Sequence, residues 1–265
     1  MTVLRVAAGQ AVSVAGDAAA NVATAARLTR SAGEAGARVL LLPEAFLTGY
    51  DHDAFRGPLP GDDLGAWLDP LRQACSETDV VLVAGVALER THGRTLSLVV
   101  VRPDGRADAP YDKQHLDPSE RPFFVAGDHG ASLVVDGVEL GLSVCYDGSF
   151  PELARAAAAD GAVAYLNSAA FFRGSEHRRD LYGRARALDN GLYVVFAGLT
   201  GRCGSFDFSG GSAIHDPEGR TLAVLGVEEG LAVADLDTEV VAATRARHTM
   251  LTDHLPGLGQ RVRVG

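Results

Sequence analysis

Two apolar segments of this chain end directly at residues whose side chains could do chemistry. Residues 39–42 run into Glu44 through a single proline, and residues 140–144 run into Cys145. In α/β proteins ligands gather at the carboxyl ends of strands, so both positions are candidate site residues. A thiol can act as a nucleophile and a carboxylate as a general base. Taken alone, a glutamate after a strand is usually a solvated loop residue, and a cysteine is usually a small buried apolar residue.

A third polar segment supplies a cation. Residues 111–116 contain Lys113 and lead into residues 118–124, which contain Glu120. A buried ammonium group is costly unless carboxylates pair with it, so a lysine and glutamates are a chemically sensible combination in one site. The three polar segments therefore have to be interpreted together.

The elements that would position these residues follow from the hydrophobic pattern. Residues 3–8 are a short apolar run typical of a buried strand. Asp17 is typical of a helix start before residues 18–35, and residues 39–42 predict a second strand. This strand, helix, strand unit implies a mostly parallel sheet. The Asp-Gly pair at 136–137 predicts a hairpin turn. The other expected helices are residues 64–77, 151–160 and 175–190, and the other expected strands are residues 80–88, 96–101, 132–135, 140–144, 163–167, 193–198, 211–214, 222–227 and 231–235.

Several segments together resemble the signatures of the carbon-nitrogen hydrolases, or nitrilase superfamily. In chain order they are residues 42–50 (LPEAFLTGY), 111–116 (YDKQHL), 141–152 (GLSVCYDGSFPE), 186–190 with 193–195, and 210–212 with 216–219. The resemblance spans nearly the whole chain. It implies an α/β fold of the four-layer αββα sandwich type, one domain over residues 1–265, and a homodimer or higher homo-oligomer.

The resemblance also implies a role for four residues. Cys145 matches the nucleophile, Glu44 the general base, Lys113 the catalytic lysine and Glu120 a second active-site glutamate. A nearby ammonium group, or the amino end of the helix that follows the cysteine, would lower the pKa of the thiol. Lys113 and the backbone N–H of Tyr146 would stabilise the oxyanion that forms when an amide carbonyl is attacked. Glu120 would orient Lys113.

Other residues are candidates for oxyanion or substrate contact. They are Tyr146, Tyr50, Ser149, Asn167, Ala169 and Arg173. Gly148 and Ser149 stand where some relatives have a charged residue, so this edge of the pocket is expected to be uncharged, although Arg173 could still contact a carboxylate. The charged side of residues 175–190 is interpreted as a solvated face. His115 could form a dyad with the cysteine, but the family has a framework histidine at this position.

The residues after the cysteine favour one reaction. Tyr146 and Asp147 are more usual among amidases and carbamoyl hydrolases, whereas nitrilases continue with Trp-Glu. The sequence therefore predicts an amidase that converts a small carboxamide to a carboxylic acid and ammonia through a thioester. The alternatives are hydrolysis of an N-carbamoyl amine or amino acid, a nitrilase, and a non-catalytic binding or scaffold member of the family.

The amino-acid composition limits the kinds of partner that the protein is expected to bind. The 265 residues include 34 acidic and 24 basic side chains, and a net charge of -10 is unlike a binder of nucleic acid or of an anionic membrane. We expect a small-molecule amide as partner, with no nucleic acid, no membrane and no cofactor. Three scattered cysteines favour a reducing cytoplasm over a disulfide scaffold. Residues 51–53 (DHD) offer ligand atoms without a second cluster, so no metal is expected.

Overall fold

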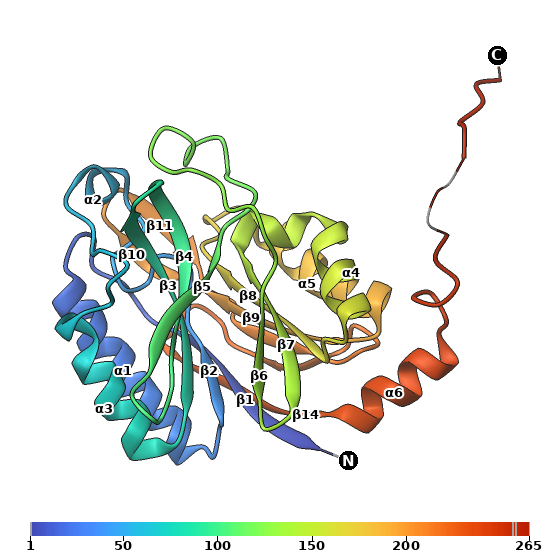
Figure 1. Cartoon of the computed structure of the whole chain (residues 1–265), viewed down its shortest axis with the longest axis horizontal. Helices are drawn as coiled ribbons and strands as arrows, with labels where there is room; N and C mark the ends of the chain where they lie inside the picture. The colour runs from blue at the N-terminus through green and yellow to red at the C-terminus, as the bar shows by residue number, and fades with distance from the viewer. Residues whose placement is uncertain (1, 256, 258, 265) are drawn as a thin grey trace.

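The computed structural model describes residues 2–255, 257 and 259–264. In these residues the strands form two six-stranded sheets and one hairpin (Figure 1). The first sheet has the order β14 (Gly230–Asp237), β1 (Val3–Gln10), β2 (Val39–Leu41), β3 (Val81–Arg90), β4 (Gly93–Val101), β5 (Ala107–Asp112). The second has the order β13 (Thr221–Val224), β12 (Ala213–His215), β9 (Tyr193–Gly198), β8 (Ala164–Ala169), β7 (Val138–Val144), β6 (Ser132–Val135). The hairpin is β10 (Thr200–Cys203) and β11 (Phe206–Ser209).

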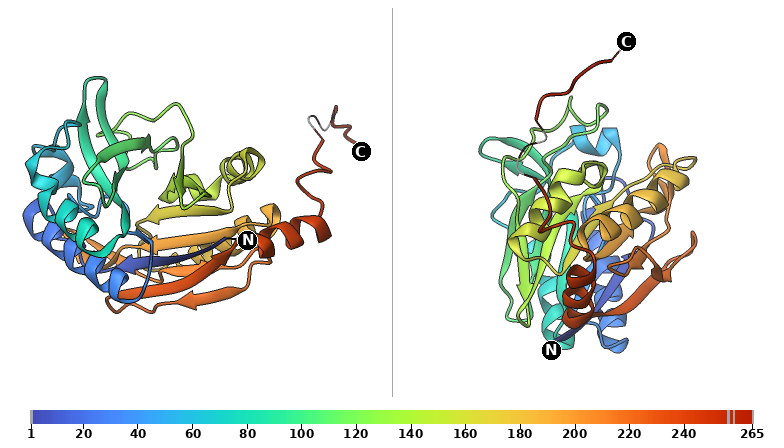
Figure 2. Two further views of the ribbon diagram at one scale, coloured as in Figure 1. Left: turned by 60° about the horizontal axis from the view of Figure 1, so that its bottom comes forward. Right: turned by 90° about the vertical axis from the view of Figure 1, so that its right-hand side faces the viewer.

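Helices cover the outer face of each sheet. Helices α1 (Ala18–Glu34) and α3 (Asp69–Thr78) lie on the first sheet, and α4 (Pro151–Asp160) and α5 (Glu176–Asn190) lie on the second (Figures 1 and 2). The shorter helices are α2 (His52–Arg56), α6 (Thr238–Arg247) and the 3₁₀ turns η1 (Ala66–Leu68) and η2 (Cys145–Ser149).

Among the described residues, three apolar cores hold the layers together. One joins α1 and α3 to the first sheet, through residues such as Leu28 and Leu71. The second fills the space between the sheets, where Val83 and Leu142 are both buried. The third joins α4 and α5 to the second sheet and includes Ala154. Helix, sheet, sheet and helix are therefore stacked in that order, and the predicted αββα sandwich is confirmed.

The strand directions correct one expectation. Only the three central strands of each sheet are parallel, β1, β2 and β3 in one and β7, β8 and β9 in the other. Several outer strands pair antiparallel through short hairpins, such as the predicted turn at residues 136–137, where Asp136 and Gly137 have φ values of 50° and 80°. By contrast, β14 pairs antiparallel with β1 although the two strands lie far apart in the chain. The expectation of mostly parallel sheets is wrong, and both sheets are mixed.

Some elements differ from the sequence expectations. The helix expected over residues 64–77 starts later, because Leu64 has a positive φ of 46° and α3 begins only at Asp69, with Pro70 in its first turn. The sequence pattern did not indicate α2, α6, β5, β10 or β11.

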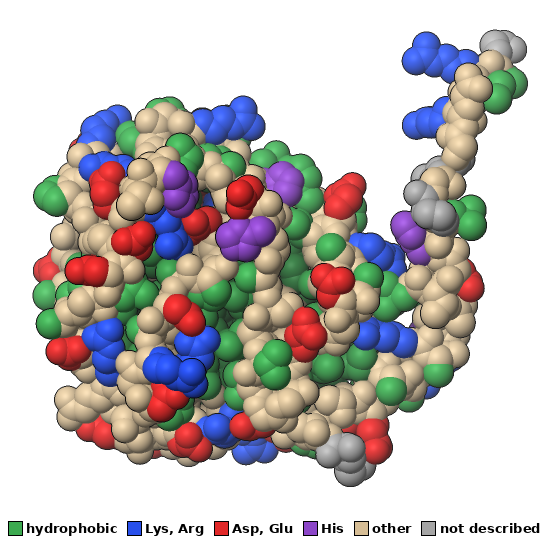
Figure 3. All heavy atoms as spheres, in the orientation of Figure 1, with side chains coloured by type: hydrophobic (Ala, Val, Ile, Leu, Met, Phe, Trp, Pro, Cys, Tyr) green, Lys and Arg blue, Asp and Glu red, His purple; other side chains and the backbone are tan. Residues whose placement is uncertain are grey.

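The surface mixes charges of both signs. Acidic and basic side chains are interspersed over the face shown in Figure 3. Within the part of the chain that the structure describes, no helix is both long enough and apolar enough to cross a membrane.

Candidate active site

The turn that carries Cys145 joins β7 to η2. Cys145 has a φ of 46°, a conformation that costs energy for a residue with a side chain. Asp147 stabilises this turn: its buried carboxylate accepts hydrogen bonds from the Val144 N–H at 3.1 Å, the Tyr111 hydroxyl at 2.8 Å and the His115 N–H at 2.9 Å. Tyr111 and His115 flank the end of β5, so Asp147 ties the cysteine turn to the segment that carries Lys113.

Glu44 lies in a tight turn directly after β2. The neighbouring strand β3 passes under this turn at Gly85, where an added Cβ atom would come within 2.5 Å of the Glu44 Cα atom. A glycine is required there because any side chain would displace Glu44. The Glu44 side chain is fully buried.

Lys113 bridges the two glutamates. Its Nζ atom lies 2.6 Å from Glu44 Oε1 and 2.7 Å from Glu120 Oε1. All three side chains are buried. Glu120 also accepts hydrogen bonds from the Tyr50 hydroxyl at 2.8 Å and from the Asp117 N–H at 2.8 Å. The ammonium therefore has two carboxylate partners, which is what a buried charge requires.

The Cys145 thiol is electrostatically coupled to this cluster. Burial raises the pKa of Glu44 to about 8, against the opposing effect of the Lys113 ammonium. Burial lowers the pKa of Lys113, but the carboxylates of Glu44 and Glu120 outweigh it, so that this pKa lies above its usual value. Burial and the Glu44 carboxylate raise the pKa of the Cys145 thiol, although Lys113 acts in the opposite direction.

The pKa of the Cys145 thiol is shifted in the direction opposite to the one expected from the sequence. The sequence predicts that the ammonium lowers the pKa of Cys145, but the net direction is upward because burial and Glu44 dominate. The thiol is therefore protonated at neutral pH and needs a base to become a nucleophile. Glu44 Oε2 is buried and, within the described residues, has no hydrogen-bond partner, so this oxygen is free to accept a proton once Glu44 is ionised.

A cavity of ≈ 340 Å³ opens at Cys145. Of the predicted contact residues, Tyr50, Tyr146 and Ser149 line it, together with Glu120. Tyr146 follows the cysteine in the first turn of η2, where backbone N–H groups lack partners within the helix.

Three predicted contact residues lie elsewhere. The Asn167 side chain packs behind the cysteine, where its Nδ2 atom donates to Ser143 Oγ at 2.9 Å and to the Cys145 carbonyl at 3.4 Å. Ala169 is buried in β8, and its neighbour Ala170 lines the cavity instead. Arg173 is exposed and does not line the cavity.

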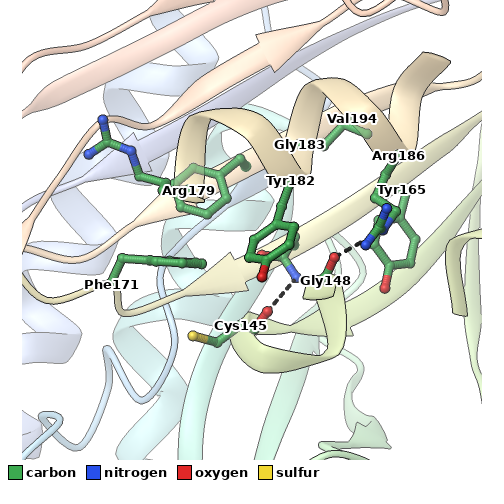
Figure 4. A pocket seen from close by; sticks show the side chains of 11 residues that line it. Cys145, Gly148, Tyr165, Phe171, Arg179, Tyr182, Gly183, Arg186 and Val194 are labelled. Atoms are coloured by element: carbon green, nitrogen blue, oxygen red, sulfur yellow. Dashed lines mark hydrogen bonds between the residues drawn. The ribbon is translucent and has the colours of Figure 1, made fainter. Parts of the chain in front are cut away.

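The side of Cys145 opposite its thiol faces a much smaller pocket. Figure 4 shows the Cys145 carbonyl turned toward this pocket and the sulfur pointing away from it. The pocket has a volume of ≈ 20 Å³ and is lined by Tyr165, Tyr182 and Arg186, among others. Arg186 donates to the Gly148 carbonyl at 3.1 Å, so this region supports η2 rather than receiving substrate.

The larger cavity contains residues that the sequence analysis did not select. They are Arg178, Tyr182, Ser175, Phe171, Phe172, Asp117, Pro118 and Ala170. Three of them lie on or just before α5, on the face interpreted from sequence as solvated. The signal that could have found them is the spacing of Arg178 and Tyr182, which places both on one helix face.

His115 and Asp51 both have hydrogen-bond partners in the framework of the structure. His115 Nδ1 lies 3.0 Å from Asp147 Oδ1 and so belongs to the framework around the cysteine turn. Asp51 caps α2 and accepts hydrogen bonds from Ser205 at 2.9 and 2.7 Å. It is buried. Within the described ranges, no group of three or more His, Cys, Asp or Glu side chains is arranged to hold a metal ion.

Comparison with known proteins identifies the family. The family model of the carbon-nitrogen hydrolases matches residues 5–246. The chain therefore belongs to this family, as its signatures predicted, and it is a hydrolase that acts on carbon–nitrogen bonds.

Individual relatives give further context. An (R)-stereoselective amidase of a Pseudomonas species is 37% identical over 222 residues, which are 81% of this chain and 78% of the relative. The deaminated glutathione amidase of Escherichia coli O157:H7 is 34% identical over 241 residues, 88% of this chain and 90% of the relative. The solved structure of an amidase from Nesterenkonia sp. AN1 matches with a TM-score of 0.84 and 31% identity, over 95% of this chain and 93% of that one. In that structure the acetamide moiety of fluoroacetamide is added covalently to the active-site cysteine.

Proposed function

We propose that the chain is an amidase that hydrolyses a small carboxamide to a carboxylic acid and ammonia, through a thioester on Cys145. The observation that carries this proposal is the buried bridge of Lys113 between Glu44 and Glu120, at 2.6 and 2.7 Å, beside the cavity at Cys145. The amidases among its relatives support the same reaction class.

The first half-reaction would acylate the cysteine. Glu44 takes the thiol proton while the Cys145 sulfur attacks the amide carbon, and the carbonyl oxygen gains negative charge. Lys113 and the Tyr146 N–H would stabilise that charge. When the intermediate collapses, the carbon–nitrogen bond breaks and Glu44 delivers its proton to the nitrogen, which leaves as ammonia. Glu44 is again a carboxylate, and the acyl group is on sulfur.

The second half-reaction would release the acid. Glu44 takes a proton from a water molecule that attacks the thioester carbon, and the carbon–sulfur bond breaks. The thiolate then recovers a proton from Glu44, and the carboxylic acid leaves. Glu120 takes part in neither proton transfer: it holds the Lys113 ammonium in place and is a positioning residue.

Ammonia release from a substrate panel tests the reaction class. We expect simple aliphatic carboxamides to yield equal amounts of ammonia and carboxylic acid. Release of carbon dioxide with ammonia from N-carbamoyl amino acids, in the absence of amide turnover, would replace the proposal with the carbamoyl alternative, and turnover of nitriles alone would favour a nitrilase. An absence of turnover on all three would favour a binding or scaffold protein.

Replacing Glu44 with glutamine removes the proposed base while keeping its size. We expect kcat/KM for a carboxamide to fall by at least about 100-fold, which is the usual contribution of a general acid–base group. Initial rates of ammonia release measure this effect, and a thermal melt shows whether the variant is folded. Asp53, an exposed carboxylate on α2, offers a matched control, since Asp53→Asn should keep full activity. A folded Glu44→Gln variant with parental kinetics would remove Glu44 from the mechanism.

The pH dependence should report the ionisation of Glu44. Among Glu44, Lys113 and Cys145, only Glu44 has a pKa near 8, because burial raises it, while the pKa values of the other two lie higher. The base must be deprotonated to accept the thiol proton, so kcat/KM should rise from pH 6 to pH 9 through an apparent pKa of about 8. A neutral amide as substrate keeps other ionisations out of the profile. A flat profile over this range would contradict the assignment of the base.

We also propose that the chain is one catalytic domain, since both sheets contribute residues to the site. The homo-oligomer and the cytoplasmic location expected from the sequence stay predictions.

A further inference from the structure

One wall of the cavity at Cys145 carries an arginine that has no acidic partner among the residues that the structure describes. Arg178, on α5, lines the cavity beside Tyr182 and Ser149. Its Nη2 atom donates a hydrogen bond to the Tyr182 hydroxyl at 2.9 Å, and its guanidinium lies 5.6 Å from the centre of that ring. Hydrogen bonding to Tyr182 raises the pKa of Arg178, and no Asp or Glu of the described residues contributes to that shift. The positive charge is therefore available to a ligand.

The acidic residues of the cavity are already hydrogen-bonded elsewhere. Glu120 accepts hydrogen bonds from Lys113, from Tyr50 and from a backbone N–H. Asp117 accepts hydrogen bonds from the Ser119 N–H at 2.9 Å and from its hydroxyl at 2.7 Å. Arg178 is the only arginine or lysine among the described residues that line this cavity. An anionic ligand could therefore pair with Arg178 without first breaking an ion pair between Arg178 and a carboxylate of the cavity.

Arg178 and Tyr182 together offer two kinds of hydrogen-bond donor, a guanidinium and a hydroxyl group. The pair is spaced i, i+4, so both side chains project from the same face of α5. Tyr182 accepts the hydrogen bond from Arg178, so its own O–H proton can still be donated. A guanidinium offers two parallel N–H groups, a geometry that matches the two oxygens of a carboxylate. In Figure 4 the Tyr182 side chain extends from α5 toward the turn that carries Cys145.

We propose that Arg178 and Tyr182 form a carboxylate subsite, so that the preferred substrates are monoamides of dicarboxylic acids. This inference rests on the proposed amide hydrolysis at Cys145 and names the class of acyl group. The amide would lie at the sulfur, the free carboxylate at Arg178, and the carbon chain against the apolar rings of Phe171 and Phe172, which line the same cavity. A volume of ≈ 340 Å³ is in the range of small-ligand pockets.

Two amides of equal carbon number test the subsite. Glutaric acid monoamide carries the distal carboxylate, and pentanamide replaces it with a methyl group. We expect Arg178→Gln to lower the ratio of kcat/KM for the monoamide to kcat/KM for pentanamide by on the order of 10-fold to 100-fold, the usual worth of a charge-assisted hydrogen bond. Tyr182→Phe should lower the ratio less, and Arg178→Lys should recover part of it. An unchanged ratio in Arg178→Gln would overturn the subsite.

Arg173 provides the matched control. It is a neighbouring exposed arginine that does not line the cavity, so Arg173→Gln should leave the ratio unchanged. An equal fall in both arginine variants would show a general effect of surface charge and would overturn the subsite.

Binding to an inactive protein separates this inference from the proposed reaction. In a Cys145→Ala background, calorimetry should show that Arg178→Gln weakens binding of glutaric acid monoamide, whatever the wild-type protein turns over. Equal affinity with and without Arg178 would reject the subsite even if amides are hydrolysed. Weakened binding without turnover of any amide would keep the subsite and reject the hydrolysis.

Discussion

Replacing Cys145 with alanine is expected to reduce amide turnover by on the order of 10⁴-fold to 10⁶-fold, the range seen when an enzyme nucleophile is removed. Without the sulfur no thioester can form, whereas Lys113 and Glu44 can still bind and polarise a substrate. The thermal stability should change little, because only one sulfur atom is removed and the turn is held by the Asp147 hydrogen bonds. Ammonia release and a thermal melt measure both effects.

Cys75 supplies the control for this experiment. It is buried in α3, and burial raises the pKa of its thiol to about 12, so it has no part in the proposed site. Cys75→Ala should therefore keep turnover, at some cost in stability. Full activity in a folded Cys145→Ala variant, or loss of activity in a folded Cys75→Ala variant, would show that the nucleophile is misidentified.

Replacing Lys113 with alanine is expected to damage both activity and stability. The variant leaves the carboxyl groups of Glu44 and Glu120 buried without the ammonium that bridges them, and removing one partner of a buried ion pair typically costs about 3–5 kcal/mol. Turnover should also fall by on the order of 10²-fold to 10³-fold, since an oxyanion donor is lost. Chemical denaturation and initial rates measure the two effects.

The loss of stability in Lys113→Ala should depend on pH in a definite direction. Lys113 holds the pKa of Glu44 down, so its removal raises that pKa further above the ordinary value. A carboxyl group with a raised pKa in the folded state favours folding less as the pH increases. In the parent, Glu44 itself has a pKa of about 8, so the two proteins lose stability alike up to about that pH and diverge above it. The destabilisation relative to the parent should therefore be larger at pH 9.5 than at pH 6. Lys113→Met restores most of the side-chain volume without the charge, and this variant should remain destabilised. If Lys113→Met instead had the stability of the parent, Lys113 would stabilise the protein through packing alone.

The sequence predicted those features that depend on local patterns. The Asp-Gly turn at 136–137, the helix that starts after Asp17 and the helix from Pro151 to Asp160 all have clear local signals, and the structure confirms them. The motifs likewise located Glu44, Lys113 and Cys145, which the fold brings together from both sheets.

Features that depend on burial and packing could not be predicted. The direction of the thiol pKa follows from how deeply Cys145 lies beside Glu44, which no motif encodes. Whether Arg173 or Arg178 lines the cavity depends on where α5 begins and on which face of α5 contacts the cavity. Asn167 has a polar side chain at a strand end, and only the packing against Ser143 shows that it supports the cysteine turn.

The central claim is tested most directly by the intact mass of the protein after brief exposure to an amide. In the Glu44→Gln variant, deacylation lacks its base, so some molecules should carry the acyl group in place of the thiol hydrogen. Peptide mapping should place that mass on Cys145, and the adduct should vanish when Cys145→Ala is added. Ammonia release by the wild-type protein together with an acyl adduct on Cys75 or Cys203, or an adduct that persists when Cys145→Ala is added, would contradict a thioester at this site.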